Sequence, residues 1–541
     1  MNKLFQKLLE VRGVGEGFLT PKYENLTVPE KLPDMEKTVK RIILAKEQGD
    51  KVLVYGDYDV DGVTATTILC EALKMTGITG VETMLPDRFV DGYGMSKRLV
   101  ERVKKEKIDL VITVDCGSNN EEIITDLNKL KTDVIVTDHH EVSGEIPDAL
   151  AVINPKRPDF RESDEGASSL EELSGAGVAF MLAKALVNAG QIPEGQEKWL
   201  LDLAMIGTIC DSMTLTKDNR IICYFGMIVL AKTKRLGLKE LMRVAKVSKI
   251  NTDAIGFQIG PRLNAAGRME TAELALKLLR TESKVEAAKT AEELDRLNQE
   301  RRTQQNQAIT EVEKEGIGED PVIIVRGNWS EGVVGIIAGR LTEKYKKPSF
   351  VLTEVDGDLK GSGRSFGEFN LALALSECQK LLINGGGHAA ACGLKLKEAK
   401  YEEFKKEINS YYAGLGLKNQ ERFLDTEEDV EADDLGDLNL ELLDDISRLE
   451  PFGEGNPAPV FLIRDAMVLR ADKMGEDGKH LRMLIGDSGD KTVKLVAFNA
   501  PKEWLEIGAG ARVNIWMSAM ENEWNGTRSL EGMILKLRYA D

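Results

Sequence analysis

Two polar stretches hold the residues whose types and spacing could do chemistry: residues 56–62 (Gly-Asp-Tyr-Asp-Val-Asp-Gly) and Asp138-His139-His140. In the first, Asp57, Asp59 and Asp61 stand at alternate positions after an apolar run, so an extended backbone would place them on one side. Such charges require a neutralising cation when they lie together, and a divalent metal ion is the simplest one. The alternative is a polar turn in which Asp61 or Thr64 caps the following helix.

An EF-hand calcium loop begins in a similar way, but it needs a glutamate six residues after its glycine and a helix on each side. Apolar Ile68 and Leu69 occupy that part of this sequence, and a strand-like run precedes it. Carboxylates combined with one or two imidazoles suit Mn²⁺ or Mg²⁺ instead. Enough carboxylates are present for two ions, which could clamp a phosphodiester and activate a water molecule.

The four histidines are His139, His140, His388 and His480. Consecutive side chains diverge, so one of the adjacent pair could bind a metal while the other faces a phosphate or a carboxylate. A capped turn is the alternative for this pair, and His480 is expected to be an ordinary packed residue. His388 follows three glycines, a context that is typical of a binding site.

Arginines beside glycines form a second set of candidates. Arg262 and Arg268 lie in the glycine-bounded stretch 260–268, which we expect to be a loop, and Arg364 lies in Gly-Ser-Gly-Arg-Ser at 361–365. Such arginines could stabilise charge on phosphoryl oxygens. Each of them could equally have a structural role when it is considered alone.

The elements that must position these residues are strands alternating with helices. Short apolar runs separated by helix-like stretches predict a parallel α/β sheet. The aspartate stretch, Asp115 and the Asp-His-His stretch each follow a predicted strand, and sites in such sheets form outside the carboxyl ends of the strands. The predicted strands are 51–55, 110–114, 133–137 and 151–153, and the predicted helices are 35–48, 64–76, 95–106 and 119–130.

The length of 541 residues predicts three or four domains, at about 100–200 residues each. A helical part from about 170 to 280 leads into a long helix near 283–315 without glycine or proline, and a smaller α/β unit and a β-barrel follow. The expected domains are 1–280 with the first sheet, a connecting helix at 281–316, a second α/β domain at 317–418, an acidic linker or solvated segment at 419–457, and a barrel at 458–541.

Composition excludes several classes of protein. The net charge of −18 argues against coating nucleic acid through bulk basicity, but a local positive channel could still hold a single strand. The longest apolar stretch, 221–231, is shorter than the roughly 18 residues of a membrane span, and the first residues lack the apolar core of a signal peptide. The six cysteines include no C-x-x-C pair, which indicates reduced thiols, so we expect a cytoplasmic protein.

Several motifs in one order carry a resemblance to a known family. They are the aspartate stretch at 57–62, Val-Asp-Cys-Gly at 114–117, Asp-His-His at 138–140, Gly-Thr-x-x-Asp at 207–211, 260–268, Gly-Gly-His at 386–388 and Pro-Phe-Gly-Glu-Gly-Asn-Pro at 451–457. The set resembles the DHH phosphoesterase superfamily with its DHHA1 domain. More narrowly, it is similar to the RecJ family of bacterial single-strand-specific 5′→3′ DNA exonucleases, whose OB-fold corresponds to the predicted barrel.

The resemblance implies a role for each matching residue. It implies two ions, Mn²⁺ or Mg²⁺, bound by Asp59, Asp61, Asp115, His139 and Asp211. Asp57 and His140 would support the metals or catalysis from close by. Substrate phosphates would be bound by Arg88, which could sense the 5′ end, and by Arg262, Asn264, Arg268, Ser362, Arg364 and His388, of which His388 could also protonate the leaving oxygen.

The resemblance implies that single-stranded DNA threads between the two α/β lobes. It also implies that the protein is a monomer and that its partners are a helicase and a single-strand-binding protein. Two departures from the family pattern are Ser330, where many members have histidine, and Cys392, where a small alanine is common. Two other functions stay open: a phosphodiesterase for nano-RNA or cyclic dinucleotides, and a non-catalytic DNA-binding scaffold. The barrel and the long helix disfavour the first, and the complete carboxylate set disfavours the second.

Overall fold

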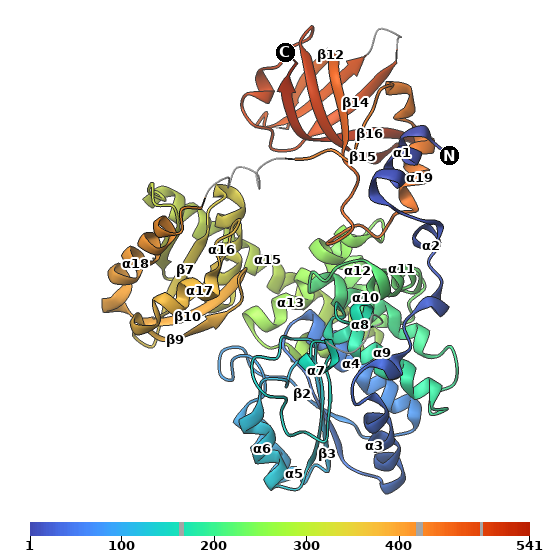
Figure 1. Cartoon of the computed structure of the whole chain (residues 1–541), viewed down its shortest axis with the longest axis vertical. Coiled ribbons are helices and arrows are strands. Elements are labelled where there is room, and N and C mark those ends of the chain that lie inside the picture. The colour runs from blue at the N-terminus through green and yellow to red at the C-terminus, as the bar shows by residue number, and fades with distance from the viewer. Residues whose placement is uncertain (162–166, 418–425, 476, 487–490, 541) are drawn as a thin grey trace. The chain divides into compact units, whose positions relative to one another are not determined.

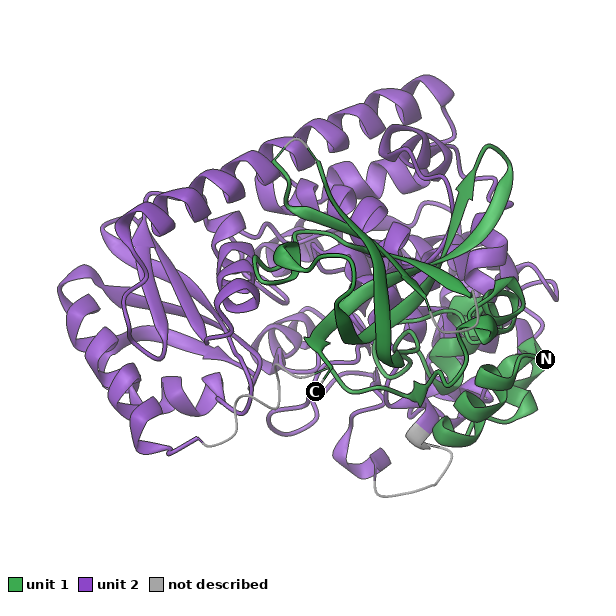
Figure 2. Cartoon of the chain, turned by 90° about the horizontal axis from the view of Figure 1, so that it is seen from above, with its two compact units in different colours: residues 1–26, 214–224, 425–541 green, residues 27–213, 225–424 purple. Residues whose placement is uncertain are grey.

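The computed structural model describes residues 1–161, 167–417, 426–475, 477–486 and 491–540 (Figure 1). They belong to two compact units (Figure 2). The larger unit comprises residues 27–213 and 225–424, and the smaller one comprises 1–26, 214–224 and 425–541. Among the described helices, none has both the length and the apolar character that crossing a membrane requires.

A five-stranded parallel sheet organises the first half of the larger unit, as predicted. Its strands are continuous apolar runs buried on both faces, which is typical of parallel sheets covered by helices. The predicted strands are confirmed, and a short half-buried edge strand, β2, was not predicted. In spatial order the strands are β2 (Glu82–Met84), β1 (Val52–Tyr55), β3 (Leu110–Val114), β4 (Asp133–Thr137) and β5 (Ala151–Ile153).

Helices cover both faces of this sheet. Figure 1 shows α5 (Lys97–Glu106) and α6 (Glu121–Lys129) on one side, with α3 (Met35–Gln48) and α4 (Val60–Thr76) on the other. The apolar faces of α5 and α6 pack with β1, β3 and β4 in one buried cluster. Behind α4 lie two helices that are apolar on nearly every side and therefore buried, α9 (Gly175–Asn188) and α10 (Leu201–Cys210).

The stretch 260–268, predicted as a loop, is instead helical. A π-helical turn, η4 (Ala254–Ile259), runs directly into α13 (Gly260–Met269). Pro261 lies at the junction of the two, and because proline has no N–H it interrupts the hydrogen-bond ladder where the π-helical turn passes into α13. Gly260 is required by packing, since a Cβ there would lie 2.4 Å from the Cys210 Sγ.

The predicted long helix is confirmed as α15 (Lys284–Glu315), 32 residues that begin at a Ser283 cap. It leads to a second sheet, in which β6 pairs with β7 in parallel and the other neighbours are antiparallel. Three helices accompany this sheet: α16 (Glu331–Tyr345), α17 (Leu371–Glu377) and α18 (Tyr401–Gly414). In spatial order the strands are β6 (Ile323–Gly327), β7 (Ser349–Val355), β8 (Asp358–Arg364), β10 (Ala391–Lys397) and β9 (Leu382–Gly387).

The smaller unit contains the predicted barrel. Five strands close because β12 pairs with both β13 and β15, and the tight hairpin between β15 and β16 turns at Asn525 and Gly526, both with positive φ. The barrel strands are β12 (Phe461–Met474), β13 (His480–Gly486), β14 (Thr492–Ala497), β16 (Thr527–Tyr539) and β15 (Arg512–Trp524).

Segments outside the predicted barrel share its core. The described part of the acidic segment 419–457 forms β11 (Val430–Glu431) and α19 (Leu440–Ser447), and its apolar residues are buried against the barrel. Helix α1 (Lys3–Arg12) also inserts Leu4, Phe5 and Leu8 into this core. The segment differs from a solvated linker because apolar residues recur between its acidic ones.

Candidate functional site

The turn between β1 and α4 fixes the first aspartates. Asp59 caps α4, and its Oδ1 accepts a hydrogen bond from the Gly62 N–H at 3.1 Å. The Asp61 carboxylate accepts bonds from the first amides of α9, Gly175 N at 2.6 Å and Ala176 N at 3.0 Å. These bonds come from the N-terminus of a neighbouring helix and fix the carboxylate of Asp61, which lies in the first turn of α4.

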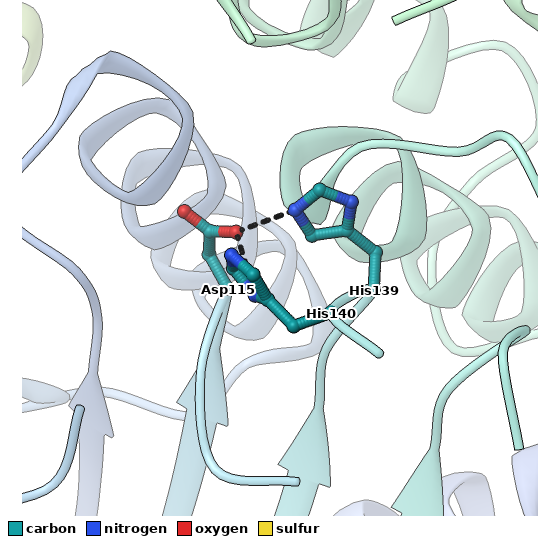
Figure 3. Close-up of side chains that lie close together, drawn as sticks. All are labelled: Asp115, His139 and His140. Carbon is teal, nitrogen blue, oxygen red and sulfur yellow. Dashed lines mark ion pairs between the residues drawn. The ribbon is translucent and has the colours of Figure 1, made fainter. Parts of the chain in front are cut away.

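Three predicted metal ligands from three parts of the chain converge on the imidazole nitrogen of a fourth, His139. The His139 Nε2 lies 3.1 Å from the Asp115 Oδ1, 3.5 Å from the Asp211 Oδ2 and 3.7 Å from the Asp61 Oδ2. Figure 3 shows Asp115, His139 and His140 pointing toward one another just beyond their strands. Asp115 follows β3, His139 follows β4, and Asp211 follows α10, so the sheet and the buried helices together assemble the cluster.

Asp115 also belongs to a second group of ligands. Carboxylate oxygens of Asp57, Asp59 and Asp115 lie within 4.8 Å of one another, as do ligand atoms of Asp61, His139 and Asp211. The two groups are adjacent, because the Asp115 Oδ1 of one lies 3.1 Å from the His139 Nε2 of the other. This arrangement matches a two-metal centre built from oxygen and imidazole ligands.

The electrostatics of the cluster require cations. Burial, with repulsion from other aspartates, raises the pKa of Asp57 and of Asp211 to about 8 and of Asp61 to about 6, and it raises the pKa of Asp115 well above its usual value. Burial likewise lowers the pKa of His139 to about 3, so this imidazole is neutral, as a metal ligand must be.

Unsatisfied polar atoms show that divalent ions fit these residues. Among the described residues, the Asp57 Oδ1, the Asp115 Oδ1 and both ring nitrogens of His139 are buried without a hydrogen-bond partner. A folded protein rarely leaves such atoms unpaired. The donor set of carboxylates and one neutral imidazole is also one that Mn²⁺ and Mg²⁺ accept.

Asp138 and Tyr93 orient the second histidine. Asp138 accepts hydrogen bonds from the backbone N–H groups of Ser118, His139 and His140 at 2.9, 2.7 and 3.1 Å. The His140 Nδ1 lies 2.8 Å from the Asp138 Oδ1 and 2.9 Å from the Tyr93 hydroxyl. Although burial lowers it, the pKa of His140 is raised to about 9 by Asp138 and other aspartates. Tyr93 was not among the predicted site residues, although it lies five residues after Arg88.

The predicted arginines form a positive group next to this centre. Arg364 Nη1 donates to the Ser362 Oγ at 3.0 Å, and Arg268 Nη1 donates to the Gly332 carbonyl at 3.4 Å. Burial, together with the charges of Arg88, Arg301 and Arg364, lowers the pKa of Arg268 to about 9. Buried cations that repel one another favour the binding of an anion such as a phosphate.

Glycines let these arginines lie close to α16. A Cβ at Gly332 would lie 1.9 Å from the Arg268 carbonyl oxygen, and a Cβ at Gly335 would lie 3.2 Å from an Arg364 nitrogen. The Nε atoms of Arg88 and Arg301 are buried without a hydrogen-bond partner among the described residues. Arg301, from α15, was not predicted, because nothing local distinguishes it from other cations of a solvated helix.

The remaining predicted residues lie in different environments. Arg262 is bound to Asp295 of α15 at 2.8 Å and to the Gln258 carbonyl at 2.7 Å, so it is a structural link between helices. Asn264 is half-buried on α13, one turn before Arg268. His388 is exposed, and its charge lowers the pKa of Glu141, the residue after His140, although the largest effect on Glu141 comes from Arg161.

Ser330, the departure from the family pattern, has a structural role. It caps α16, and its Oγ accepts a hydrogen bond from the Gly332 N–H at 3.4 Å. Cys392, the second departure, is buried beside Gly363, where a Cβ would lie 2.6 Å from its Sγ.

The carboxylate–histidine cluster at the carboxyl ends of a parallel sheet, next to a group of arginines that includes Arg364 of a second α/β domain, defines a DHH-type phosphoesterase. Family models agree: residues 51–208 match the DHH family, N-terminal domain, residues 319–414 match the DHHA1 domain, and residues 429–536 match the RecJ OB domain. The chain belongs to the RecJ family of single-stranded-DNA-specific exonucleases.

Two curated relatives and two solved structures illustrate this membership. RecJ of Bacillus subtilis is 35% identical over 96% of this chain and 65% of its own length, so the chain spans about two thirds of that relative. RecJ of Escherichia coli is 32% identical over 93% of this chain and 90% of its own length. Crystal structures of Thermus thermophilus RecJ in complex with Mn²⁺ and with Mg²⁺ match with TM-scores of 0.82 and 0.77, at 29% and 28% identity, over 99% of this chain and 78% and 77% of theirs.

Proposed function

We propose that this chain degrades single-stranded DNA from its 5′ end by metal-dependent hydrolysis and releases 5′-mononucleotides during DNA recombination and repair. The observation that carries the proposal is the convergence of Asp61, Asp115 and Asp211 on His139 beside a buried group of arginines. Membership of a family of single-stranded-DNA-specific exonucleases supports it, and so do the Mn²⁺ and Mg²⁺ complexes of the Thermus relative.

The side chains divide the work between two groups. Asp57, Asp59, Asp61, Asp115, Asp211 and His139 would hold two divalent ions. When bound, such ions neutralise phosphoryl oxygens and make a water molecule nucleophilic at neutral pH. Asp138 and Tyr93 keep the His140 ring in place, so that its other nitrogen can face the substrate.

The arginine group would position the strand. Arg364 and Ser362 present a guanidinium and a hydroxyl from neighbouring positions of β8, and Arg268 presents a second guanidinium from α13. Guanidinium groups bind phosphate oxygens with paired hydrogen bonds. Arg88, whose guanidinium lies 4.5 Å above the Tyr58 ring, would contact the phosphate at the 5′ end.

The barrel would hold the incoming strand by stacking and by phosphate contacts, as OB-folds do. A helicase that supplies single strands and a single-strand-binding protein would be the partners of a cytoplasmic monomer. This follows from the family, because the reaction needs DNA that has already been unwound.

The test is digestion of a long oligonucleotide labelled at either end, with Mn²⁺, Mg²⁺ or EDTA, beside the same sequence as a duplex. We expect metal-dependent release of mononucleotides from the 5′ end of the single strand alone. Release from the 3′ end would refute the polarity. Cleavage of dinucleotides without cleavage of the long strand, or binding without hydrolysis, would refute the exonuclease assignment.

A further inference from the structure

An arginine remote from the metal centre ties together the far ends of two helices that carry metal ligands. Arg235 lies just before α12 (Leu236–Ala245), and its guanidinium forms a double hydrogen bond with Glu71, in which the Nη2–Oε2 distance is 2.8 Å. Its Nε lies 3.2 Å from the Asp202 Oδ2. Asp202 is only 1% exposed, and the Thr233 hydroxyl also donates to it, at 2.8 Å. We call Glu71, Asp202 and Arg235 the ion cluster.

The two carboxylates of the ion cluster lie toward the ends of their helices that are remote from the metal ligands. Glu71 follows Asp61 by ten positions on α4, and Asp202 precedes Asp211 by nine positions at α10. At a rise of about 1.5 Å per residue, each carboxylate is roughly 14–15 Å from the ligand of its own helix. The ion cluster therefore touches neither the ligands nor a substrate held by them.

The helices are also in contact near the metal ligands. A Cβ at Gly207 of α10 would lie 2.4 Å from the Asp61 Oδ1 and 2.7 Å from the Thr64 Oγ1, so α10 lies directly on the first turn of α4 there. The two helices pack against each other, and packed side chains alone permit small sliding shifts of one helix along another. The ion cluster adds directional hydrogen bonds at the end of the pair that is remote from the ligands, and these bonds fix the register of the two helices.

We propose that Arg235 is a positioning residue of the metal centre, which sets the distance between Asp61 and Asp211 by locking α4 against α10. The inference rests on the proposed function, because it assumes that both aspartates bind metal. Lysine cannot replace the arginine, since one ammonium group cannot form two parallel hydrogen bonds with Glu71 and also reach Asp202. Asp202 would then lose the planar partner that offsets its burial.

A matched control comes from Arg157. Its side chain is 12% exposed, the same as that of Arg235, and it joins two carboxylates, Asp34 at 2.8 Å and Asp159 at 2.6 Å. Neither Asp34 nor Asp159 lies on an element that carries a predicted ligand. Both substitutions should lower the thermal unfolding midpoint, Arg235→Lys by more because the side chain of Asp202 is 1% exposed whereas those of Asp34 and Asp159 are 34% and 56% exposed. Only Arg235→Lys should change metal binding.

The experiment is a titration of the metal-free full chain with Mn²⁺, in which the electron paramagnetic resonance of free Mn²⁺ reports binding. We expect Arg235→Lys to weaken the Mn²⁺ affinity about tenfold, as loss of supporting partners does at other metal sites, and Arg157→Lys to leave it unchanged. The Mn²⁺ concentration for half-maximal cleavage should rise by the same factor, with kcat retained at saturating Mn²⁺.

Equal Mn²⁺ affinity in Arg235→Lys and the wild type would overturn the proposal, and so would equal weakening in both variants. If Arg235→Lys does not fold, Glu71→Gln keeps an acceptor for the arginine and should weaken Mn²⁺ binding to a smaller extent. An unchanged affinity in this second variant would be equally decisive. A wild-type chain that binds no Mn²⁺ would instead refute the metal centre itself, so the two failures can be distinguished.

Discussion

Replacing Asp115 by asparagine separates the role of its charge in metal binding from its effect on stability. Asparagine has the same shape, and it tolerates the φ of 61° that Asp115 adopts. The shape must be kept because Gly175 is so close that a Cβ there would lie 2.5 Å from the Asp115 Cβ. The substitution therefore changes the charge and little else.

The distances within the cluster give the magnitude. Oxygens of Asp57, Asp59 and Asp115 lie within 4.8 Å of one another. At an effective dielectric constant of about 20, two unit charges at this separation repel by roughly 3.5 kcal/mol. Binding of protons relieves part of this repulsion, since the pKa of Asp115 is raised. We therefore expect Asp115→Asn to stabilise the metal-free protein by about 1–3 kcal/mol and to slow cleavage about 10³-fold or more.

The assay is thermal unfolding in EDTA and in Mn²⁺, with cleavage of a single-stranded oligonucleotide measured alongside. In EDTA, Asp115→Asn should unfold at a higher temperature than the wild type. Addition of Mn²⁺ should raise the unfolding midpoint of the wild type more than that of Asp115→Asn. A lower midpoint in EDTA, or cleavage within about tenfold of the wild type, would refute the reasoning from charge repulsion and metal bridging.

Asp138→Asn serves as a control, because its expected effect on the stability of the metal-free protein is opposite in sign to that of Asp115→Asn. Burial raises the pKa of Asp138, but the hydrogen bond and charge of His140 and the Ser118 amide outweigh it, so the pKa is lowered. Its ionised form therefore contributes stability above the unfolded pKa of about 3.9, which is lost as the pH falls through the lower folded value. Asp138→Asn should thus destabilise the metal-free protein at neutral pH, whereas Asp115→Asn stabilises it.

Three further predictions concern pH, phosphate binding and helix capping. Because the pKa values of Asp57 and Asp211 are raised to about 8, the stability that these groups contribute is complete only below about pH 3.9 and is lost as the pH rises through about 8. Unfolding midpoints in EDTA should accordingly fall with rising pH, and saturating Mn²⁺ should abolish the fall. Arg364→Lys should weaken single-strand binding about tenfold with its salt dependence retained, measured by fluorescence anisotropy, because the ammonium keeps the charge but lacks the planar fork of the guanidinium. Ser330→Ala should cost about 1 kcal/mol in urea unfolding through loss of the α16 cap, with cleavage unchanged; a large loss of cleavage would show that Ser330 acts on the substrate.

The local pattern of apolar and polar residues was sufficient to predict most of the strands and helices. Alternating apolar runs and helix-like stretches predicted β1, β3, β4 and β5, and a run without glycine or proline predicted α15. The clusters at strand ends predicted the metal centre for the same reason: parallel strands end at one edge of a sheet, so residues far apart in sequence meet there.

Other features depend on contacts between distant segments. The stretch 260–268 is a helix that packs at Gly260 against Cys210, a contact that no local pattern encodes. The acidic segment before the barrel is buried because α1, at the other end of the chain, covers the same core. The contact of Arg262 with Asp295 of α15 likewise joins segments that no motif relates.

The sequence by itself determined which residue types were available for chemistry and at which strand ends they would stand, since strand and helix periods are local properties. Only the tertiary structure decided which atoms meet. It brought Asp211 to His139, placed Tyr93 against His140, and joined Glu71 to Asp202 through Arg235. These pairings arise from the docking of whole helices, whose relative position is set by many packed side chains at once and by no single motif.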